Sequence, residues 1–106
     1  MVNREVVEIV KKYLKELESQ GIHISNAYLY GSQARGTATE ESDIDLMLVS
    51  PLFDVDFHKY LRAIWFSKFR SDNNIEPFVV GEKRFLTDDI SPIIGIVRHE
   101  GIEISA

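Results

Sequence analysis

The chain has 106 residues, of which 44% are hydrophobic and 27% charged, so we expect one globular domain over residues 1–106. The net charge of -5 disfavours a broad nucleic-acid interface, because such an interface needs clustered Lys and Arg. The sequence has no cysteine, no apolar run near the roughly 20 residues of a membrane span, and no apolar signal core at its start, so we expect a cytoplasmic location.

Helical and extended patterns alternate along the chain. Residues 4–19 repeat apolar side chains at helical spacing between a capping Asn3 and a terminating Gly21. Further helices are expected at residues 32–36, 57–69 and 92–100, and strands at residues 22–30, 44–49, 75–80 and 102–104. Pro77 in the third strand indicates an edge position or a bulge. The alternation predicts an α/β fold in which helices pack on a sheet.

Asp43 and Asp45 lie one residue apart from each other at the start of the second expected strand. Because side chains at i and i+2 point to the same face of a strand, the two carboxylates are expected together, with Ile44 and Leu46 facing the core. Paired carboxylates repel unless a proton or a cation neutralises them. Oxygen ligands without a nearby His or Cys favour magnesium or manganese over zinc. The pair therefore predicts a magnesium site that also contacts substrate phosphates.

A glycine-serine turn precedes these carboxylates. Gly31 permits a tight turn at the end of the first expected strand. The hydroxyl of Ser32 and the following backbone amides can then point at phosphate oxygens. Arg35 can reach a triphosphate or stack on a base, and Gly36 lets the chain leave the turn. These four residues are the candidate nucleotide-binding residues, although the turn is not a Walker loop because the lysine of that motif is missing.

A third carboxylate would complete a two-metal site, in which one ion orients the attacking oxygen and the other steadies the leaving pyrophosphate. Glu76 is the best candidate, because it lies among apolar residues of the third expected strand, where we expect it to be buried. Asp72 and Glu82 are poorer candidates, because both are expected in turns. We predict that Asp43, Asp45 and Glu76 are the metal ligands and catalytic residues, with Glu76 also the base for the incoming hydroxyl.

The order Gly31-Ser32, then the ten residues Gln33 to Ser42, then Asp43-Ile44-Asp45 resembles the motif of the nucleotidyltransferase superfamily of DNA polymerase beta. The fuller string, with Ala34-Arg35-Gly36, looks like the minimal nucleotidyltransferases, or MNT proteins. The resemblance implies a polymerase beta-like fold with a small mixed sheet. It also implies that the two aspartates bind two Mg2+ ions together with ATP, and that the serine contacts the triphosphate. Glu76 takes the place of a third acid that is often aspartate in that family.

The resemblance also implies a partner. Many MNT proteins form a toxin-antitoxin pair with a small helical HEPN protein, and the MNT member is similar to enzymes that move AMP from ATP onto a tyrosine hydroxyl of the HEPN ribonuclease. This implies an antitoxin that acts by AMPylation within a homo- or hetero-oligomer. Two alternatives stay open: a non-catalytic antitoxin that masks its partner, and an adenylyltransferase for a small hydroxylated molecule such as an aminoglycoside.

The expected helix over residues 57–69 carries a wide aromatic stripe. Trp65 lies on the main stripe, and we expect it to pack in the core. Tyr60 and Phe66 lie off this stripe and are the candidates for a partner interface, because aromatic side chains dominate the binding energy of many interfaces.

Overall fold

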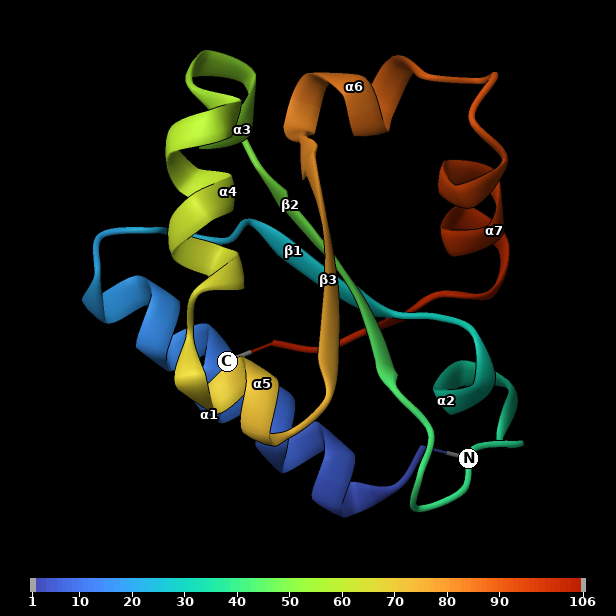
Figure 1. The fold of residues 1–106 in the computed structure, drawn as a ribbon. Helices are drawn as coiled ribbons and strands as arrows, with labels where there is room; N and C mark the ends of the chain where they lie inside the picture. The colour runs from blue at the N-terminus through green and yellow to red at the C-terminus, as the bar shows by residue number, and fades with distance from the viewer. Residues whose placement is uncertain (1, 106) are drawn as a thin grey trace.

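The computed structural model describes residues 2–105 and contains a four-stranded sheet with the strand order β3–β2–β1–β4 (Figure 1). The strands are β1 (Asn26–Leu29), β2 (Ile44–Ser50), β3 (Ile75–Gly81) and β4 (Ile102–Glu103). Strand β1 is antiparallel to β2 and to β4, whereas β2 and β3 are parallel. This mixed sheet confirms the predicted α/β fold, and Pro77 lies in an edge strand as predicted.

Helices cover both faces of the sheet (Figure 1). They are α1 (Arg4–Ser19), α2 (Ser32–Arg35), α3 (Leu52–Val55), α4 (Phe57–Trp65), α5 (Lys68–Asp72), α6 (Glu82–Thr87) and α7 (Pro92–Glu100). Side chains of α1, α3, α4 and α5 pack on one face, and side chains of α6 and α7 pack on the other. Among residues 2–105, the longest and most apolar helical stretches fall short of what a membrane span requires.

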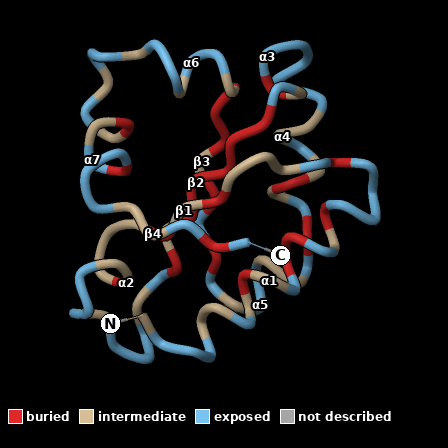
Figure 2. Tube along the Cα trace, turned by 180° about the vertical axis from the view of Figure 1, so that it is seen from behind, coloured by how far each residue is buried: buried red, intermediate tan, exposed pale blue. Residues whose placement is uncertain are grey.

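Two apolar clusters, one on each face of the sheet, determine which way the side chains of β2 point. Ile44 and Leu46 belong to the larger cluster with α1 and α4, whereas Met47 and Val49 belong to the smaller cluster with α7. Figure 2 shows the buried residues gathered in the strands and the exposed residues on the outer sides of the helices. Because side chains alternate along a strand, Asp45 points to the face of the smaller cluster.

Helix α1 has the bounds that its periodicity predicts. The side-chain oxygen of Asn3 accepts a hydrogen bond from the Glu5 amide at 2.8 Å and caps the helix. Gly21 follows the helix with a φ of 81°, the left-handed conformation typical of this position. Tyr13 is fully buried and donates a hydrogen bond to the carbonyl oxygen of Ile64 at 2.9 Å. This bond ties α1 to α4 beneath the sheet.

The first strand is shorter than the predicted range of residues 22–30. The amide of Ile22 donates to the carbonyl of Leu17 at 2.9 Å, so this residue completes the end of α1. Pairing with β2 begins where the amide of Ser25 donates to the carbonyl of Val49 at 2.8 Å. Ile22, at the start of the predicted strand, is therefore part of the end of α1 and not of the sheet.

The single helix predicted over residues 57–69 is two helices, α4 and α5. Asp56 caps α4 and accepts from the Lys59 amide at 3.3 Å. Ser67 caps α5 by accepting from the Arg70 amide at 3.2 Å, and its hydroxyl donates to Glu16 at 2.6 Å. Because this serine bonds to α1, it interrupts the helical pattern and starts a new helix.

The short helices α3 and α6 are absent from the sequence prediction. The carboxylate of Asp54 in α3 accepts a hydrogen bond from the Lys83 amide at 3.1 Å, so the first turn of α6 is held by a residue far away in sequence. Glu82, expected in a turn, lies in α6, and Asp72, also expected in a turn, is the last residue of α5.

The aromatic stripe divides as follows. Trp65 is partly buried against the larger cluster, as expected. Tyr60 also packs against this cluster, and its ring lies 6.1 Å from that of Phe53. Phe66 is 80% exposed, so of the two interface candidates it is the one that presents its ring to solvent.

Candidate functional site

The predicted carboxylates lie at the same end of two neighbouring parallel strands. Asp45 of β2 is paired in register with Glu76 of β3, and Asp43 immediately precedes β2. Phe78 and Val80 of β3 pack in the smaller cluster, so the alternation of the strand places the Glu76 side chain on the same face as Asp45. The fold thus brings together acids that are about thirty residues apart in sequence.

Glu76 is exposed, so the expectation that it is buried among apolar neighbours is wrong. Ile94 and Val97 of α7 cover the part of this face that carries Val80. The opposite end of the face, where β2 and β3 begin, stays open. Glu76 therefore lies at the rim of the smaller cluster, where Asp45 is half-buried.

The glycine-serine turn lies directly on Asp45. Gly31 has a φ of 71° and a ψ of -146°, a conformation that residues with a side chain rarely adopt. A Cβ atom at Gly31 would lie 2.5 Å from Oδ2 of Asp45. The amide of Tyr30 also donates to the carbonyl oxygen of Asp45 at 3.1 Å. The turn approaches the carboxylate this closely because position 31 has no side chain.

Charged groups converge on this carboxylate. Burial, and then the charges of Asp43 and Glu76, raise the pKa of Asp45, while the Arg35 guanidinium opposes the rise. Burial and the charges of Asp45 and Glu76 raise the pKa of the Tyr30 hydroxyl to about 12. Tyr30 is a neighbour of the site that the sequence analysis missed, and its place directly before the glycine-serine turn is the signal that could have identified it.

The remaining candidate nucleotide-binding residues surround α2. Ser32 begins this helix, and its hydroxyl has no hydrogen-bond partner within residues 2–105. Gly36 ends the helix with a φ of 78° and a ψ of 19°, a left-handed conformation that favours glycine. Nη1 of Arg35 lies 3.2 Å from Oε1 of Glu100 at the end of α7. Glu100 is a second neighbour that the sequence analysis missed, and its distance along the chain leaves no local signal.

The donor atoms of this site suit a hard cation. Asp43, Asp45 and Glu76 offer carboxylate oxygens. Burial, and then the charges of Asp43 and Glu76, raise the pKa of Asp45, so a cation beside it would stabilise its charged form. Within the described part of the chain, no three side chains of His, Cys, Asp and Glu are gathered closely enough to hold a metal ion as they stand. The chemistry of the donors therefore fits magnesium, and full coordination would need oxygens from a bound substrate or movement of the exposed acids.

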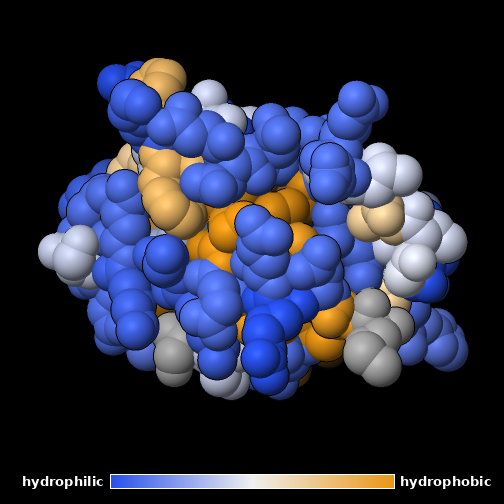
Figure 3. Space-filling view, turned by 90° about the horizontal axis from the view of Figure 1, so that it is seen from below, coloured by the Kyte–Doolittle hydropathy of each residue, from blue (hydrophilic) through white to orange (hydrophobic). Residues whose placement is uncertain are grey.

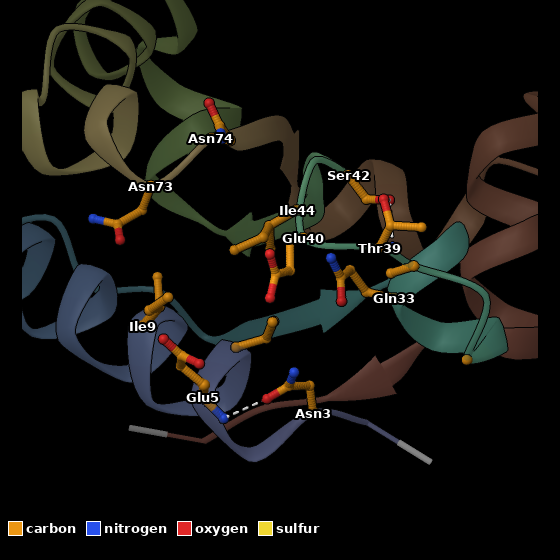
Figure 4. Close-up of a pocket in the computed structure, with 13 residues that line it drawn as sticks. Asn3, Glu5, Ile9, Gln33, Thr39, Glu40, Ser42, Ile44, Asn73 and Asn74 are labelled. Carbon is orange, nitrogen blue, oxygen red and sulfur yellow. Dashed lines mark hydrogen bonds between the residues drawn. The ribbon is translucent and has the colours of Figure 1, made fainter.

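A cavity of about 580 Å³ lies beside the chain that enters β2 (Figure 4). Ser42 and Ile44 line it, but Asp43, which stands between them, does not. Neither do Asp45 and Glu76. The cavity is thus separate from the carboxylate site, although the two share a loop.

A crystal structure described as a putative nucleotidyltransferase from Sulfolobus solfataricus has this fold. It superposes with a TM-score of 0.58 at 18% sequence identity and covers 92% of this chain and 77% of that chain. At this identity the likeness concerns the fold alone.

The sequence identifies the family. Residues 7–105 match the model of the nucleotidyltransferase domain, so the chain belongs to this family of transferases, as the motif resemblance predicts. Two relatives from Methanocaldococcus jannaschii are each named a putative protein adenylyltransferase. One is 34% identical over 98 residues, which are 89% of this chain and 65% of that protein. The other is 46% identical over 64 residues, which are 57% of this chain and 60% of that protein. The matches thus span less than two thirds of either relative.

Proposed function

We propose that this protein is a magnesium-dependent adenylyltransferase that moves AMP from ATP to a tyrosine hydroxyl of a HEPN-type toxin and so acts as its antitoxin. The observation that carries the proposal is the pairing of Asp45 with Glu76 in register, next to a turn at Gly31 so close that an added Cβ there would lie 2.5 Å from the Asp45 carboxylate. A nucleotide in the turn would place its phosphates beside these acids.

In this proposal Asp43, Asp45 and Glu76 hold two magnesium ions together with ATP. The ions would neutralise charge on the phosphates and on the attacking oxygen. In the proposal Glu76, which is exposed at the rim, also accepts the proton of the incoming hydroxyl. The hydroxyl oxygen forms a bond to the α-phosphorus, the bond from that phosphorus to the bridging oxygen breaks, and pyrophosphate leaves with the electron pair.

Ser32 and Arg35 are proposed to bind the triphosphate. The Ser32 hydroxyl is not used by another described residue and is free to donate to a phosphate oxygen. Arg35 lies near enough to act on the pKa of Asp45, and it needs only to leave an exposed ion pair with Glu100, which is weakly held. Gly31 and Gly36 shape the turn that presents both side chains.

A protein acceptor is favoured by the relatives, each of which is named a putative protein adenylyltransferase. The HEPN partner and the antitoxin role rest on the resemblance of the glycine-serine and Asp-x-Asp motif to MNT proteins. The open rim around Glu76 suits an acceptor that is presented from outside. A complex of the two proteins is part of the proposal.

A contrasting function is neutralisation by masking, in which the protein covers its partner and transfers nothing. The exposed Phe66 supports a contact surface, and the exposure of Glu76 leaves the third acid less constrained than in a buried site. A small hydroxylated acceptor is the other alternative.

Label transfer separates these functions. The protein is mixed with its HEPN partner, Mg2+ and ATP labelled at either the α- or the γ-phosphate. The proposal expects label on the partner from α-labelled ATP alone, and loss of label with Asp45→Asn. Neutralisation of the toxin without any label would support masking, and label that reaches an aminoglycoside but not the partner would support the small-molecule alternative.

A further inference from the structure

The outer side of α4 combines positive charge with an exposed aromatic ring. Lys59, Arg62 and Phe66 follow one another at helical spacing, so their side chains leave the same side of the helix. All three residues are exposed, and Phe66, which caps the end of α4, is 80% exposed. Ile64, on the opposite side of the helix, is fully buried in the larger cluster. We call the three exposed residues the α4 face.

The positive charges of the α4 face are not neutralised by neighbours. Among residues 2–105, neither Lys59 nor Arg62 forms an ion pair, and the carboxylate of Asp56 is used as the cap of α4. Residues 57–71 contain four basic residues and no acidic one, although acidic residues outnumber basic ones by 17 to 12 in the whole chain. The surface that complements this part of the molecule is therefore acidic.

Phe66 adds an apolar contact point to these charges. Of the side chains that the structure describes, its ring packs in neither of the two apolar clusters. Aromatic rings are enriched among the residues that dominate binding at protein interfaces. A partner that fits the α4 face thus presents acidic side chains around an apolar one.

Arg70 connects the α4 face to the carboxylate site. Its Nε donates to the carbonyl oxygen of Trp65 and its Nη1 to that of Ile75, each at 2.9 Å. The guanidinium also lies 4.6 Å from the centroid of the Trp65 ring, which adds a cation–π contact. Trp65 precedes Phe66, and Ile75 precedes Glu76. One side chain therefore holds the end of α4 against the start of β3, and a protein bound at Phe66 lies close to Glu76.

Strand β3 is the edge of the sheet between the α4 face and the open rim of the carboxylate site. Figure 1 shows α4 leading through α5 into the start of β3. Figure 3 views the molecule from this end and shows mainly hydrophilic side chains, with apolar surface between them. A partner that extends from the α4 face around this edge crosses polar surface, so a charged segment suits the path better than an apolar one.

We infer that the α4 face binds an acidic segment of the protein that receives the nucleotide. Its carboxylates pair with Lys59 and Arg62, and an apolar side chain packs on Phe66. The inference rests on the proposed function only in naming the partner as the acceptor. The α4 face anchors the partner so that its hydroxyl can reach Glu76, and it takes no part in the reaction itself.

A single-stranded nucleic acid is the competing occupant, because its phosphates pair with cations and its bases stack on aromatic rings. The net charge of -5 and the acids at the nearby rim repel a chain of phosphates. A protein segment can place its few carboxylates on the α4 face and keep other side chains at the rim. The observations therefore favour the protein.

The test measures binding in EDTA without ATP, so its outcome is separate from that of label transfer. The blocked peptide acetyl-Glu-Glu-Leu-Leu-Glu-Glu-amide is titrated into isotope-labelled protein and followed by amide chemical shifts. We expect saturable shifts at Lys59, Arg62 and Phe66. The matched peptide with glutamine in place of glutamate should bind at least about fivefold more weakly, and the acidic peptide should itself bind more weakly as salt is added.

Variants of the α4 face give the second arm. The double variant Lys59→Gln, Arg62→Gln should bind the acidic peptide at least about fivefold more weakly, because it loses two charge pairs. Phe66→Ser should lose a similar factor through the apolar contact. All three side chains are exposed, so the amide spectra of both variants should show the fold intact.

Two matched controls make the same chemical changes elsewhere. Lys11→Gln, Lys15→Gln removes two positive charges from α1 that form no ion pair within the described residues. Leu86→Ser removes a large apolar side chain of α6 that is 69% exposed. Both controls should bind the acidic peptide within about twofold of wild type, because both charges and the apolar side chain lie outside the α4 face.

Three results would overturn the inference. One is equal binding of the acidic and glutamine peptides, or no binding of either at about 10 mM, a concentration at which even weak contacts register. Another is wild-type affinity in the double variant or in Phe66→Ser, with the fold shown intact. The third is an oligouridine of about eight nucleotides that binds the α4 face at least about tenfold more tightly than the acidic peptide, which would make single-stranded nucleic acid the partner.

Discussion

Replacement of Asp45 by asparagine is expected to stabilise the metal-free protein at neutral pH. Burial and the neighbouring carboxylates raise the pKa of Asp45 above its usual value of 3.8, so the folded state favours the protonated form more than the unfolded state does. The stability linked to this group therefore falls as the pH rises from 3.8 through the folded pKa. Asparagine has nearly the same shape but no charge, so at a pH above the folded pKa it removes the cost of keeping a charged carboxylate at position 45.

The size of the effect follows from the strand geometry. Neighbouring strands lie about 4.8 Å apart, and two charges separated by about the same distance would repel by about 1 kcal/mol in surroundings like water. Solvent screens Asp45, which is only half-buried, so we expect a gain of about 0.5–1 kcal/mol at pH 7. The gain should shrink as the pH falls through the raised pKa toward 3.8, because the wild-type carboxyl takes up its proton over this range.

Urea denaturation in EDTA at both pH values measures this difference. Glu41→Gln is the matched control, because it removes one exposed negative charge and should leave the stability nearly unchanged. With Mg2+ in place of EDTA, the wild type should gain more stability than Asp45→Asn, because the variant lacks one proposed ligand. A variant that is equal or lower in stability at pH 7 would refute the reasoning on charge crowding.

Three further predictions concern the turn, the core and the nucleotide. Gly31→Ala should lower the free energy of unfolding by about 2 kcal/mol or more, because φ at this position is positive and the Asp45 carboxylate is close. Gly21→Ala, which also has a positive φ but open space around it, should lower the free energy of unfolding by only about 1 kcal/mol. Equal losses in urea denaturation would contradict the close contact at Gly31. Tyr13→Phe should lower it by about 1–2 kcal/mol, since a buried carbonyl loses its donor, and calorimetry should show unchanged ATP binding. Glu100→Gln should lower the Kd for Mg·ATP by up to about fivefold, because Arg35 is released from an exposed ion pair and is free to bind the triphosphate. A rise in Kd would instead mean that the ion pair holds Arg35 in the position that binds ATP.

The features that the sequence predicts best depend on local patterns. The bounds of α1 follow from its cap and its periodicity, and the core-facing side chains of β2 follow from strict alternation around Asp45. The glycine-serine turn is likewise local, and its positive φ at Gly31 is what a glycine in that place indicates. The order of the two motifs was enough to predict the family.

The features that the sequence misses depend on contacts between distant residues. The exposure of Glu76 is decided by where α7 packs, and no pattern around residue 76 carries that information. Helix α6 begins against Asp54, and α5 begins because Ser67 bonds to Glu16. The pairing of Arg35 with Glu100 joins two helix ends that come together only in the folded chain.

The most direct test of the site is the initial rate of adenylyl transfer by Glu76→Gln, measured with α-labelled ATP and the HEPN partner. If Glu76 acts as the third acid together with Asp43 and Asp45, the rate should fall by about 100-fold or more, since general acid-base catalysis contributes about 100- to 10,000-fold. Glu82→Gln, the matched change at a poorer candidate in α6, should stay within twofold of wild type. Transfer by Glu76→Gln at the wild-type rate would contradict the assignment of the third acid.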